Sequence, residues 1–265
     1  MDINKIMDSA SPLWGVCGFE IIRNSLIECR AKSRLPENAR SVIVACFPYL
    51  LPEENYKNSN ISKYAVVTDY HDVAVSRLQN ACNELQKLFP ENKFVPFADN
   101  SPVPEVKAAL YAGLGVCGKN SLLITEKYGS YVFLGEIVTD LEMTAEPASV
   151  RACIGCGKCV AACPAKAITA RGISAEQCLS AITQKKGELT EKEKELMAEC
   201  GCVWGCDICQ DICPMNKNTA VEPTEEFLCN PVPVLTDKTS LDGRAYAWRG
   251  QKVINRNLEI LKNGD

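Results

Sequence analysis

The sequence predicts an α+β protein, in which a front domain of mixed strands and helices is followed by a small cysteine-rich domain. Strand and helix patterns alternate up to about Leu141. Ten of the sixteen cysteines then fall between Cys153 and Cys213. A chain of 265 residues that is 46% hydrophobic is long enough for one full domain and a smaller one. We expect domains at residues 1–148 and 149–220, and a short helical segment at 221–265.

The front domain contains three predicted strands and two predicted helices. The β-branched run at 41–49 and the apolar runs at 93–99 and 130–141 are typical of buried strands. Apolar residues recur at helical spacing along 71–89, which predicts a helix with one face on a core. A second helix is expected in 104–115, because a proline lies near its first turn and glycines follow its end.

The second half begins with a polar linker, expected at 142–150. Residues 174–182 are expected to form a short helix. Thr190 and Glu193 have the spacing of a capping box, so Thr190 is expected to open the next helix. The C-terminal stretch is expected to form one or two short helices.

Charge and cysteine usage narrow the classes of function. The net charge of −4 gives no global electrostatic reason to bind nucleic acid. The N-terminus lacks an apolar signal-peptide core, and no apolar run is long enough to span a membrane. We therefore expect a cytoplasmic protein without a membrane partner, whose clustered cysteines bind metal. His71 is the only histidine, which disfavours histidine-rich metal sites.

Two cysteine motifs define the metal chemistry. The stretch "CIGCGKCVAACP" at 153–164 has the C-x2-C-x2-C-x3-C-P spacing of bacterial ferredoxins. In two-cluster proteins the cysteine before the proline ligates the other cluster, so a second motif is required. The stretch "CDICQDICP" at 206–214 supplies it. A zinc site is the alternative, but the repeated motif favours two [4Fe-4S] clusters.

Two cubane clusters need eight thiolates, and the two motifs supply seven. We select Cys178 as the eighth ligand, while Cys200 and Cys202 remain alternatives. One cluster is then expected to bind Cys153, Cys156, Cys159 and Cys213. The other is expected to bind Cys163, Cys178, Cys206 and Cys209.

The glycine-rich loop "AGLGVCGKNS" at 112–121 suggests a nucleotide site at first sight. A P-loop needs Ser or Thr directly after its lysine, and Asn120 follows Lys119 here. Both nucleotide motifs also need a strand before the glycines, whereas a helix is predicted there. The loop is therefore predicted to be a helix stop and a tight turn.

Several stretches together resemble the epoxyqueuosine reductase family, the cobalamin-dependent enzymes of tRNA queuosine synthesis. The resemblance runs from about Leu35 to Lys262, and its stretches occur in the family's order. They are "LPENARSVIVACFPY", "SKYAVVTDYH", "FADNSPVPEVKAALYAGLGVCGKNSLLI", "GSYVFLGEIVTDL", "CLSAIT" and "WGCDICQDICPMN".

The resemblance implies that the front domain is a corrinoid-binding, catalytic domain that holds cobalamin base-off. Asp99 falls where the family has its proton-donating aspartate. Leu123 and Leu134 would line the corrin pocket, and Asp207 would contact the cofactor beside Cys206, whose cluster would reduce the cobalt to a nucleophilic Co(I) state. Lys119 and Asn120 are candidates for contacts to the corrin side chains or the substrate. His71 and Tyr64 could reach the substrate pocket, but we interpret His71 as a structural histidine.

The resemblance also implies partners, and the sequence differs from the family's pattern at some positions. An electron donor such as ferredoxin or flavodoxin, tRNA as substrate and a monomeric state are expected. Met215 replaces the family's tryptophan, Cys117 departs within the glycine loop, and we expect a short form without the C-terminal helical repeats that grip tRNA. The leading hypothesis is an epoxide reductase acting on epoxyqueuosine in tRNA. The alternatives are a corrinoid-docking, ferredoxin-type electron carrier or activator and a flavin-linked ferredoxin oxidoreductase.

Overall fold

The computed structural model describes residues 2–145, 150–170 and 172–263. They divide into two compact units, each assembled from segments that are distant in sequence. Unit 1 comprises Met1–Pro48, His71–Cys117 and Leu122–Cys153. Unit 2 comprises Tyr49–Tyr70, Gly118–Ser121 and Ile154–Asp265. The domain boundaries expected from the sequence stay a prediction, and residues 146–149 of the expected linker lie outside the described residues.

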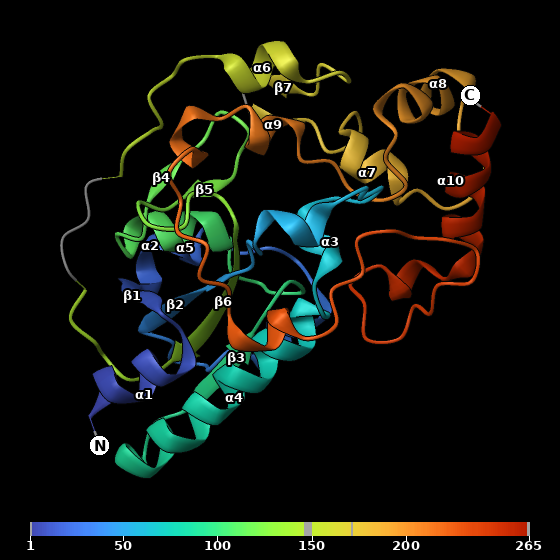
Figure 1. The fold of residues 1–265 in the computed structure, drawn as a ribbon. Coiled ribbons are helices and arrows are strands. Elements are labelled where there is room, and N and C mark those ends of the chain that lie inside the picture. Colours follow the sequence, from blue (N-terminus) through green and yellow to red (C-terminus); the bar gives the residue numbers. More distant parts are fainter. Residues whose placement is uncertain (1, 146–149, 171, 264–265) are drawn as a thin grey trace. The chain divides into compact units, whose positions relative to one another are not determined.

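Unit 1 is built on a four-stranded antiparallel sheet (Figure 1). Its strand order is β1-β2-β6-β3, where the strands are β1 (Leu13–Gly18), β2 (Ser41–Pro48), β6 (Val132–Thr139) and β3 (Phe94–Phe97). Every residue of β2 is buried, because this inner strand is covered on both faces. The three strands predicted from the sequence are confirmed as β2, β3 and β6.

Helices cover the two faces of this sheet. Gly135 of β6 faces α4 (Tyr70–Leu88), since a Cβ placed on it would lie 2.8 Å from Leu78 Cδ1. The opposite face packs in one apolar cluster with α2 (Phe19–Arg23) and α5 (Glu105–Tyr111). Helix α1 (Ile3–Ala10) contacts β1, and a 3-10 turn, η1 (Arg30–Arg34), lies between α2 and β2 in the chain. The two helices predicted for the front domain are confirmed as α4 and α5.

The glycine loop follows α5, as expected for a helix stop. Gly113 has a φ of 76°, and the backbone N–H groups of Gly113 and Leu114 donate to carbonyls of the last helical turn. The two-residue strands β4 (Val116–Cys117) and β5 (Leu123–Ile124) then pair. Gly115 permits this pairing, because a Cβ there would lie 2.4 Å from the Ile124 carbonyl oxygen. The helix before the glycines removes the strand that either nucleotide motif requires.

Unit 2 is formed by short elements. Its helices and 3-10 turns are η2 (Glu53–Tyr56), α3 (Lys63–Val66), α6 (Lys158–Ala162), α7 (Leu179–Thr183), α8 (Glu191–Cys200), α9 (Ile208–Asp211), η3 (Pro214–Asn216), η4 (Glu225–Leu228), η5 (Ala247–Arg249) and α10 (Gln251–Asn263). A small hairpin joins β7 (Ile168–Thr169) to β8 (Gly172–Ile173). Helix α6 packs against α9, and α8 packs against α7 and α10. The α+β class predicted from the sequence is confirmed.

Two sequence expectations can be compared directly with unit 2. The capping box of α8 is present, because the Thr190 side chain accepts from the Glu193 N–H and the Glu193 side chain accepts from the Thr190 N–H. The expected helix at 174–182 was placed too early, since α7 begins at Leu179. Cys178 is the N-cap residue of α7 and has an extended backbone. Its N–H donates to the Ser174 carbonyl, which closes a turn before the helix. Among the described helices, none is long and apolar enough to cross a bilayer.

Candidate functional site

A solvent-exposed carboxyl group, Asp99, lies at the end of β3 in unit 1. Its backbone adopts a φ of 58°, a left-handed conformation that aspartate tolerates better than most residues. Asp99 Oδ2 lies 3.2 Å from His71 Nε2 at the start of α4, and the Asp99 side chain is 59% exposed. The Asp99 backbone N–H donates to Glu105 Oε1 over 3.2 Å. His71 of α4 and Glu105 of α5 thus hold Asp99 in place, while its carboxyl group remains open to solvent.

A second carboxyl group, Glu136, lies fully buried in the same unit. It belongs to inner strand β6, opposite Val44 of β2 and Phe97 of β3. Glu136 Oε2 accepts a hydrogen bond from Ser101 Oγ over 3.0 Å. The Ser101 backbone N–H in turn donates to the Asp99 carbonyl over 2.6 Å. The loop that carries Asp99 is therefore tied to the core through Ser101.

The protonation of the two glutamates follows from their surroundings. Burial raises the pKa of Glu105 to about 8, and the nearby charge of Asp99 adds to the rise while His71 opposes it. Burial also raises the pKa of Glu136 well above its usual value, and Glu105 contributes to that rise. At neutral pH both carboxyl groups favour the protonated form.

Sequence reasoning selected Asp99 and did not select Glu105 or Glu136. One signal was available, because Glu136 is an acidic residue inside an otherwise apolar strand. His71, interpreted as structural, contacts Asp99 in the structure. No signal in the sequence pointed to this contact, which arises because the start of α4 lies beside the end of β3.

The cysteines of unit 2 gather around Cys209. Burial raises the pKa of the Cys209 thiol to about 11, and the nearby thiols of Cys178, Cys159 and Cys163 add to the rise. Cys206 of the same motif interacts with Cys209 and Cys202, and burial raises its pKa to about 12. This arrangement brings together the four cysteines expected for the second cluster, which are Cys163, Cys178, Cys206 and Cys209.

Cys200 and Cys202, the alternative eighth ligands, also interact with cysteines of the two motifs. Cys200 interacts with Cys163, and Cys202 interacts with Cys206. The Cys202 thiol, however, donates to the carbonyls of Trp204 and Gly205 over 3.4 and 3.0 Å. The Cys202 thiol is thus already used in a local turn, whereas the Cys178 thiol interacts electrostatically with that of Cys209.

The donor set fits iron–sulfur clusters better than a single metal ion. Among the described residues, no three Cys, His, Asp or Glu side chains are close enough to hold one ion. A cubane cluster makes a different demand, because each of its four thiolates binds a different iron atom and the sulfurs do not converge on one ion. The buried thiols are protonated at neutral pH, so iron would have to displace their protons on binding.

Asp207 and Lys63 line a cavity of about 280 Å³ in unit 2, together with Cys202 and Cys206. Asp207 Oδ2 accepts from the Lys63 backbone N–H over 2.6 Å. Its other oxygen, Oδ1, is buried and has no hydrogen-bond partner among the described residues. Burial raises the pKa of Asp207 to about 6, while Lys63 opposes the rise. An unpartnered buried oxygen beside Cys206 is available to a polar group of a bound molecule.

The remaining predicted contacts lie in different settings. Leu123 is buried in the apolar cluster of unit 1, and Leu134 is partly buried against it. In unit 2 Lys119 is exposed, whereas Asn120 is 3% exposed. The Asn120 side chain forms a hydrogen bond with the Cys209 thiol, so it supports a proposed cluster ligand.

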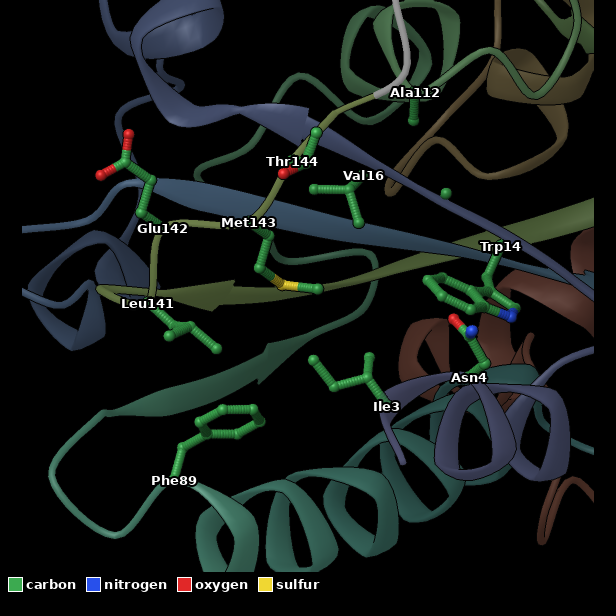
Figure 2. Close-up of a pocket in the computed structure, with 11 residues that line it drawn as sticks. Ile3, Asn4, Trp14, Val16, Phe89, Ala112, Leu141, Glu142, Met143 and Thr144 are labelled. Atoms are coloured by element: carbon green, nitrogen blue, oxygen red, sulfur yellow. The ribbon is translucent and has the colours of Figure 1, made fainter. Parts of the chain in front are cut away.

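A separate cavity of about 590 Å³ lies in unit 1, between the start of α1, strand β1 and residues 141–144. Figure 2 shows Ile3, Phe89 and Met143 pointing toward one another across it. None of the residues that line it was predicted as a site residue, and Asp99 and Glu105 are not among them.

Comparison with family models identifies two matching segments. Residues 152–216 match the family described as "4Fe-4S double cluster binding domain", which confirms the expected two-cluster domain. Residues 30–100 match the family described as "Epoxyqueuosine reductase QueG, DUF1730". The second segment ends one residue after Asp99.

Curated relatives carry the same name. The chain is 34% identical over 212 residues to an epoxyqueuosine reductase of Cellulophaga algicola, covering 78% of this chain and 68% of the relative. It is also 34% identical over 221 residues to an epoxyqueuosine reductase of Lactococcus garvieae, covering 78% of this chain and 62% of the relative. A third epoxyqueuosine reductase, from Listeria monocytogenes, is 34% identical over 206 residues, which cover 73% of this chain and 54% of the relative. The chain thus spans between half and about two thirds of the length of most of these relatives.

Solved structures share the fold. The epoxyqueuosine reductase of Streptococcus thermophilus aligns with a TM-score of 0.81 at 25% identity, over 99% of this chain and 80% of that one. An epoxyqueuosine reductase in complex with an epoxyqueuosine-modified tRNA-Tyr stem loop aligns with a TM-score of 0.81 at 22% identity, over 98% of this chain and 79% of that one. The epoxyqueuosine reductase of Bacillus subtilis, with its catalytic aspartate loop swung out of the active site, aligns with a TM-score of 0.79 at 22% identity, over 97% of this chain and 80% of that one. A reductive dehalogenase whose structure suggests a B12-dependent mechanism aligns with a TM-score of 0.53 at 16% identity, over 96% and 35%.

Proposed function

The chain belongs to the epoxyqueuosine reductase family, and from this premise we propose that it is a cobalamin-dependent, double-[4Fe-4S] oxidoreductase that reduces an epoxide. Its leading substrate is epoxyqueuosine in tRNA. The reaction adds two electrons and two protons to the epoxide, and it releases an alkene and one water. A protein that performs it needs an electron path and an acid beside the reacting oxygen.

The observation that carries this proposal is the setting of Asp99. Its carboxyl group is open to solvent, and the contacts to His71 and Glu105 fix its position. We assign Asp99 as the acid that gives a proton to the epoxide oxygen as the carbon–oxygen bond breaks. The B. subtilis structure, in which a catalytic aspartate loop moves, supports placing the acid on a loop.

The electron path is assigned to the two clusters. We propose that one is bound by Cys153, Cys156, Cys159 and Cys213, and the other by Cys163, Cys178, Cys206 and Cys209. The gathering of the latter four around Cys209 supports the second assignment. Asn120 holds the Cys209 sulfur by a hydrogen bond, and hydrogen bonds to cluster sulfurs tune reduction potentials.

Cobalamin, when bound, would supply a cobalt centre that takes electrons singly and delivers them to the substrate. On unit 1, Leu123 and Leu134 are the proposed corrin contacts. On unit 2, Asp207 offers its unpartnered Oδ1 to a polar side chain of the corrin, and the exposed Lys119 is a further candidate. The dehalogenase likeness supports the fold that such a cofactor would need.

The proposed partners are tRNA and a small electron-transfer protein such as ferredoxin or flavodoxin, with the enzyme acting as a monomer in the cytoplasm. The stem-loop complex of one relative supports tRNA as substrate. Because the net charge is −4, we expect binding to depend on local lysines and arginines and to weaken steeply with salt.

Absorption spectra of the anaerobically purified chain, before and after addition of cobalamin, test the proposal. We expect iron–sulfur absorption from the protein alone and a shift of the cobalamin spectrum to a base-off form on binding. The absence of corrinoid binding would overturn the proposed cofactor. Corrinoid binding without epoxide reduction, in a protein whose Asp99→Asn variant behaves like the parent, would indicate an electron carrier instead.

A further inference from the structure

The two proposed clusters differ in how far protein covers the residues beside their ligands. Large apolar side chains are exposed directly beside three ligands of the first cluster: Ile154 (67% exposed) follows Cys153, Val160 (37%) follows Cys159, and Ile212 (43%) precedes Cys213. Beside the second cluster, the residues that follow Cys178 and Cys209 are buried. Among the eight proposed ligands, all of which the structure describes, Cys156 is exposed and the other seven are partly buried. The first cluster is therefore the one that a partner protein can reach.

The sequence around the first cysteine motif is positively charged, although the whole chain carries a net charge of −4. No Asp or Glu occurs between Glu146 and Glu176. The same stretch contains four basic residues, which are Arg151, Lys158, Lys166 and Arg171. A local excess of positive charge in an acidic protein favours a negatively charged partner.

Two lysines present positive charge to solvent in unit 2. Lys158 opens α6 and Lys217 caps the end of η3, and both are exposed. Neither lysine forms an ion pair with a residue that the structure describes. The carboxylates of the second motif do not neutralise them, because the Asp207 side chain is only 11% exposed and Asp211 binds Lys63 over 2.6 Å. Both positive charges are thus available to a partner.

The exposed parts of the two motifs meet in unit 2, because α6 packs against α9, which leads into Ile212 (Figure 1). We call Ile154, Lys158, Val160, Ile212 and Lys217 the first-cluster rim. It combines three exposed aliphatic side chains with two unpaired ammonium groups. Exposed apolar side chains that gather in one place mark an interaction surface, and complementary charge selects the partner and speeds the encounter.

Electrons for the proposed reaction come from another protein, and the first cluster is the one that is open to it. We propose that the first-cluster rim is the docking surface for an acidic, flavin-carrying electron-transfer protein of the flavodoxin class. The aliphatic side chains of the rim meet the apolar edge of the flavin ring, and its lysines pair with carboxylates beside that ring. This inference rests on the proposed function and on the proposed ligands of the first cluster.

Each docking event passes one electron. The reduced flavin is oxidised by one electron and the first cluster is reduced by one, while no covalent bond forms or breaks and no proton crosses the interface. Two docking events supply the two electrons that each epoxide consumes. The rim residues therefore govern the entry of electrons and take no part in the chemistry at the epoxide.

Stopped-flow absorption of the cluster-loaded protein, mixed anaerobically with reduced flavodoxin, follows the bleaching of the clusters without any turnover. At low salt, the double variant Lys158→Glu/Lys217→Glu should be reduced roughly tenfold more slowly than the parent. The difference should vanish in about 0.5 M salt, because exposed charges are then screened. Lys186→Glu/Lys238→Glu changes the same number of charges at exposed lysines outside the motifs, and it should react like the parent. A photoreduced deazaflavin, which is small and uncharged, should reduce all three proteins at the same rate.

The apolar part of the rim has its own test. Ile154→Ser should weaken the binding of oxidised flavodoxin about fivefold in titration calorimetry, because less apolar surface is covered on docking. Leu228→Ser is the matched control, since Leu228 is 54% exposed and lies in η4, outside the motifs. Iron analysis verifies that Ile154→Ser keeps both clusters.

Three outcomes would overturn the docking surface. The first is an unchanged rate of reduction by flavodoxin in Lys158→Glu/Lys217→Glu at low salt. The second is lysine-dependent reduction by an acidic ferredoxin with none by flavodoxin, which would assign the rim to a different occupant. The third is loss of affinity for a tRNA stem loop in the double variant while reduction by flavodoxin is unchanged, which would make the rim an RNA contact.

Epoxide reduction driven by the deazaflavin separates this inference from the proposed function. The parent and Lys158→Glu/Lys217→Glu should then reduce the epoxide equally. If neither reduces it but the flavodoxin rates differ as expected, the docking surface stands and the proposed function is wrong. If both reduce it and the flavodoxin rates are also equal, the proposed function stands and the docking surface is wrong.

Discussion

Gly135 is the residue that allows helix and sheet to approach closely in unit 1. A Cβ at this position would lie 2.8 Å from Leu78 Cδ1, 3.2 Å from the Phe97 carbonyl oxygen and 3.3 Å from the Phe47 ring. Contacts of this length are not tolerated without movement of the neighbours. The next residue, Glu136, faces the opposite side of the strand, so the close approach of α4 also fixes where the buried carboxyl group lies.

We expect Gly135→Ala to lower the free energy of unfolding by about 1–3 kcal/mol, because overpacking forces neighbouring side chains out of place. Denaturant unfolding of the anaerobic, cluster-loaded protein measures this. Gly18→Ala is the matched control, since a Cβ there meets only Ile21 Cδ1, at 4.0 Å. Equal stability of Gly135→Ala and the parent would show that α4 does not pack against β6 as described.

At this scale, the sequence predicted residues whose chemistry is local and missed those whose role depends on neighbours. The cysteines stand out by spacing alone, and Asp99 was selected through its flanking sequence. Glu105 looks like an ordinary first-turn glutamate, which is common at helix N-termini, and nothing nearby in sequence announces its burial. Its contact with Asp99 depends on a loop with a left-handed residue, which sequence patterns do not specify.

Helix α8 shows an element whose start is set by its own residues. Thr190 and Glu193 cap each other's backbone groups, and Met197 on the inner face packs with Leu179 and Ile182. The same helix ends at Cys200, whose thiol interacts with that of Cys163. The cap therefore stabilises a helix that borders the proposed second cluster.

Removal of the cap should loosen this helix locally. Thr190→Ala should lower local stability by about 1 kcal/mol, since an unsatisfied N–H is left at the helix start. Amide hydrogen exchange in α8 should then be about fivefold faster than in the parent. Thr190→Ser retains the hydroxyl group and should exchange nearly as slowly as the parent. Unchanged exchange in Thr190→Ala would mean that packing alone holds the helix.

Elements were predictable where periodicity was strong. Strands β2 and β6 and helix α4 follow their apolar patterns closely. Helix α7 was placed too early, because residues 174–178 have helical composition but close a turn that leaves Cys178 extended. The two-residue strands β4 and β5 carry too little pattern to be found, and tertiary contacts at Gly115 define them.

The molecule consists of two units, and each is built from segments that are separated in the sequence. Residues 49–70 and 118–121 belong to unit 2, although unit 1 surrounds them in sequence. This assignment of segments to units depends on long-range packing, which hydrophobic periodicity cannot reveal. The pairing of the two cysteine motifs, by contrast, could be inferred, because the crossed ligation of two-cluster ferredoxins requires a second motif.

The cluster assignment is tested at this scale by counting iron. The parent, purified anaerobically, should hold about eight irons and eight sulfides per chain. Cys178→Ala should lose one cluster and fall to about four irons, whereas Cys200→Ala and Cys202→Ala should keep both. Cys229→Ala, at an exposed cysteine outside the motifs, is the control. Loss of a cluster in Cys200→Ala or Cys202→Ala, with both retained in Cys178→Ala, would assign the eighth thiolate elsewhere.

The proposed reaction of this chain is the reduction of an epoxide with Asp99 as the acid. The most direct measurement is anaerobic incubation of the cluster- and cobalamin-loaded protein with epoxyqueuosine-containing tRNA and a strong reductant, followed by mass spectrometry of the modified nucleoside. The nucleoside should lose one oxygen atom with the parent protein and none with Asp99→Asn. Unchanged epoxyqueuosine after incubation with a parent protein that holds both clusters and cobalamin would contradict the proposed reaction.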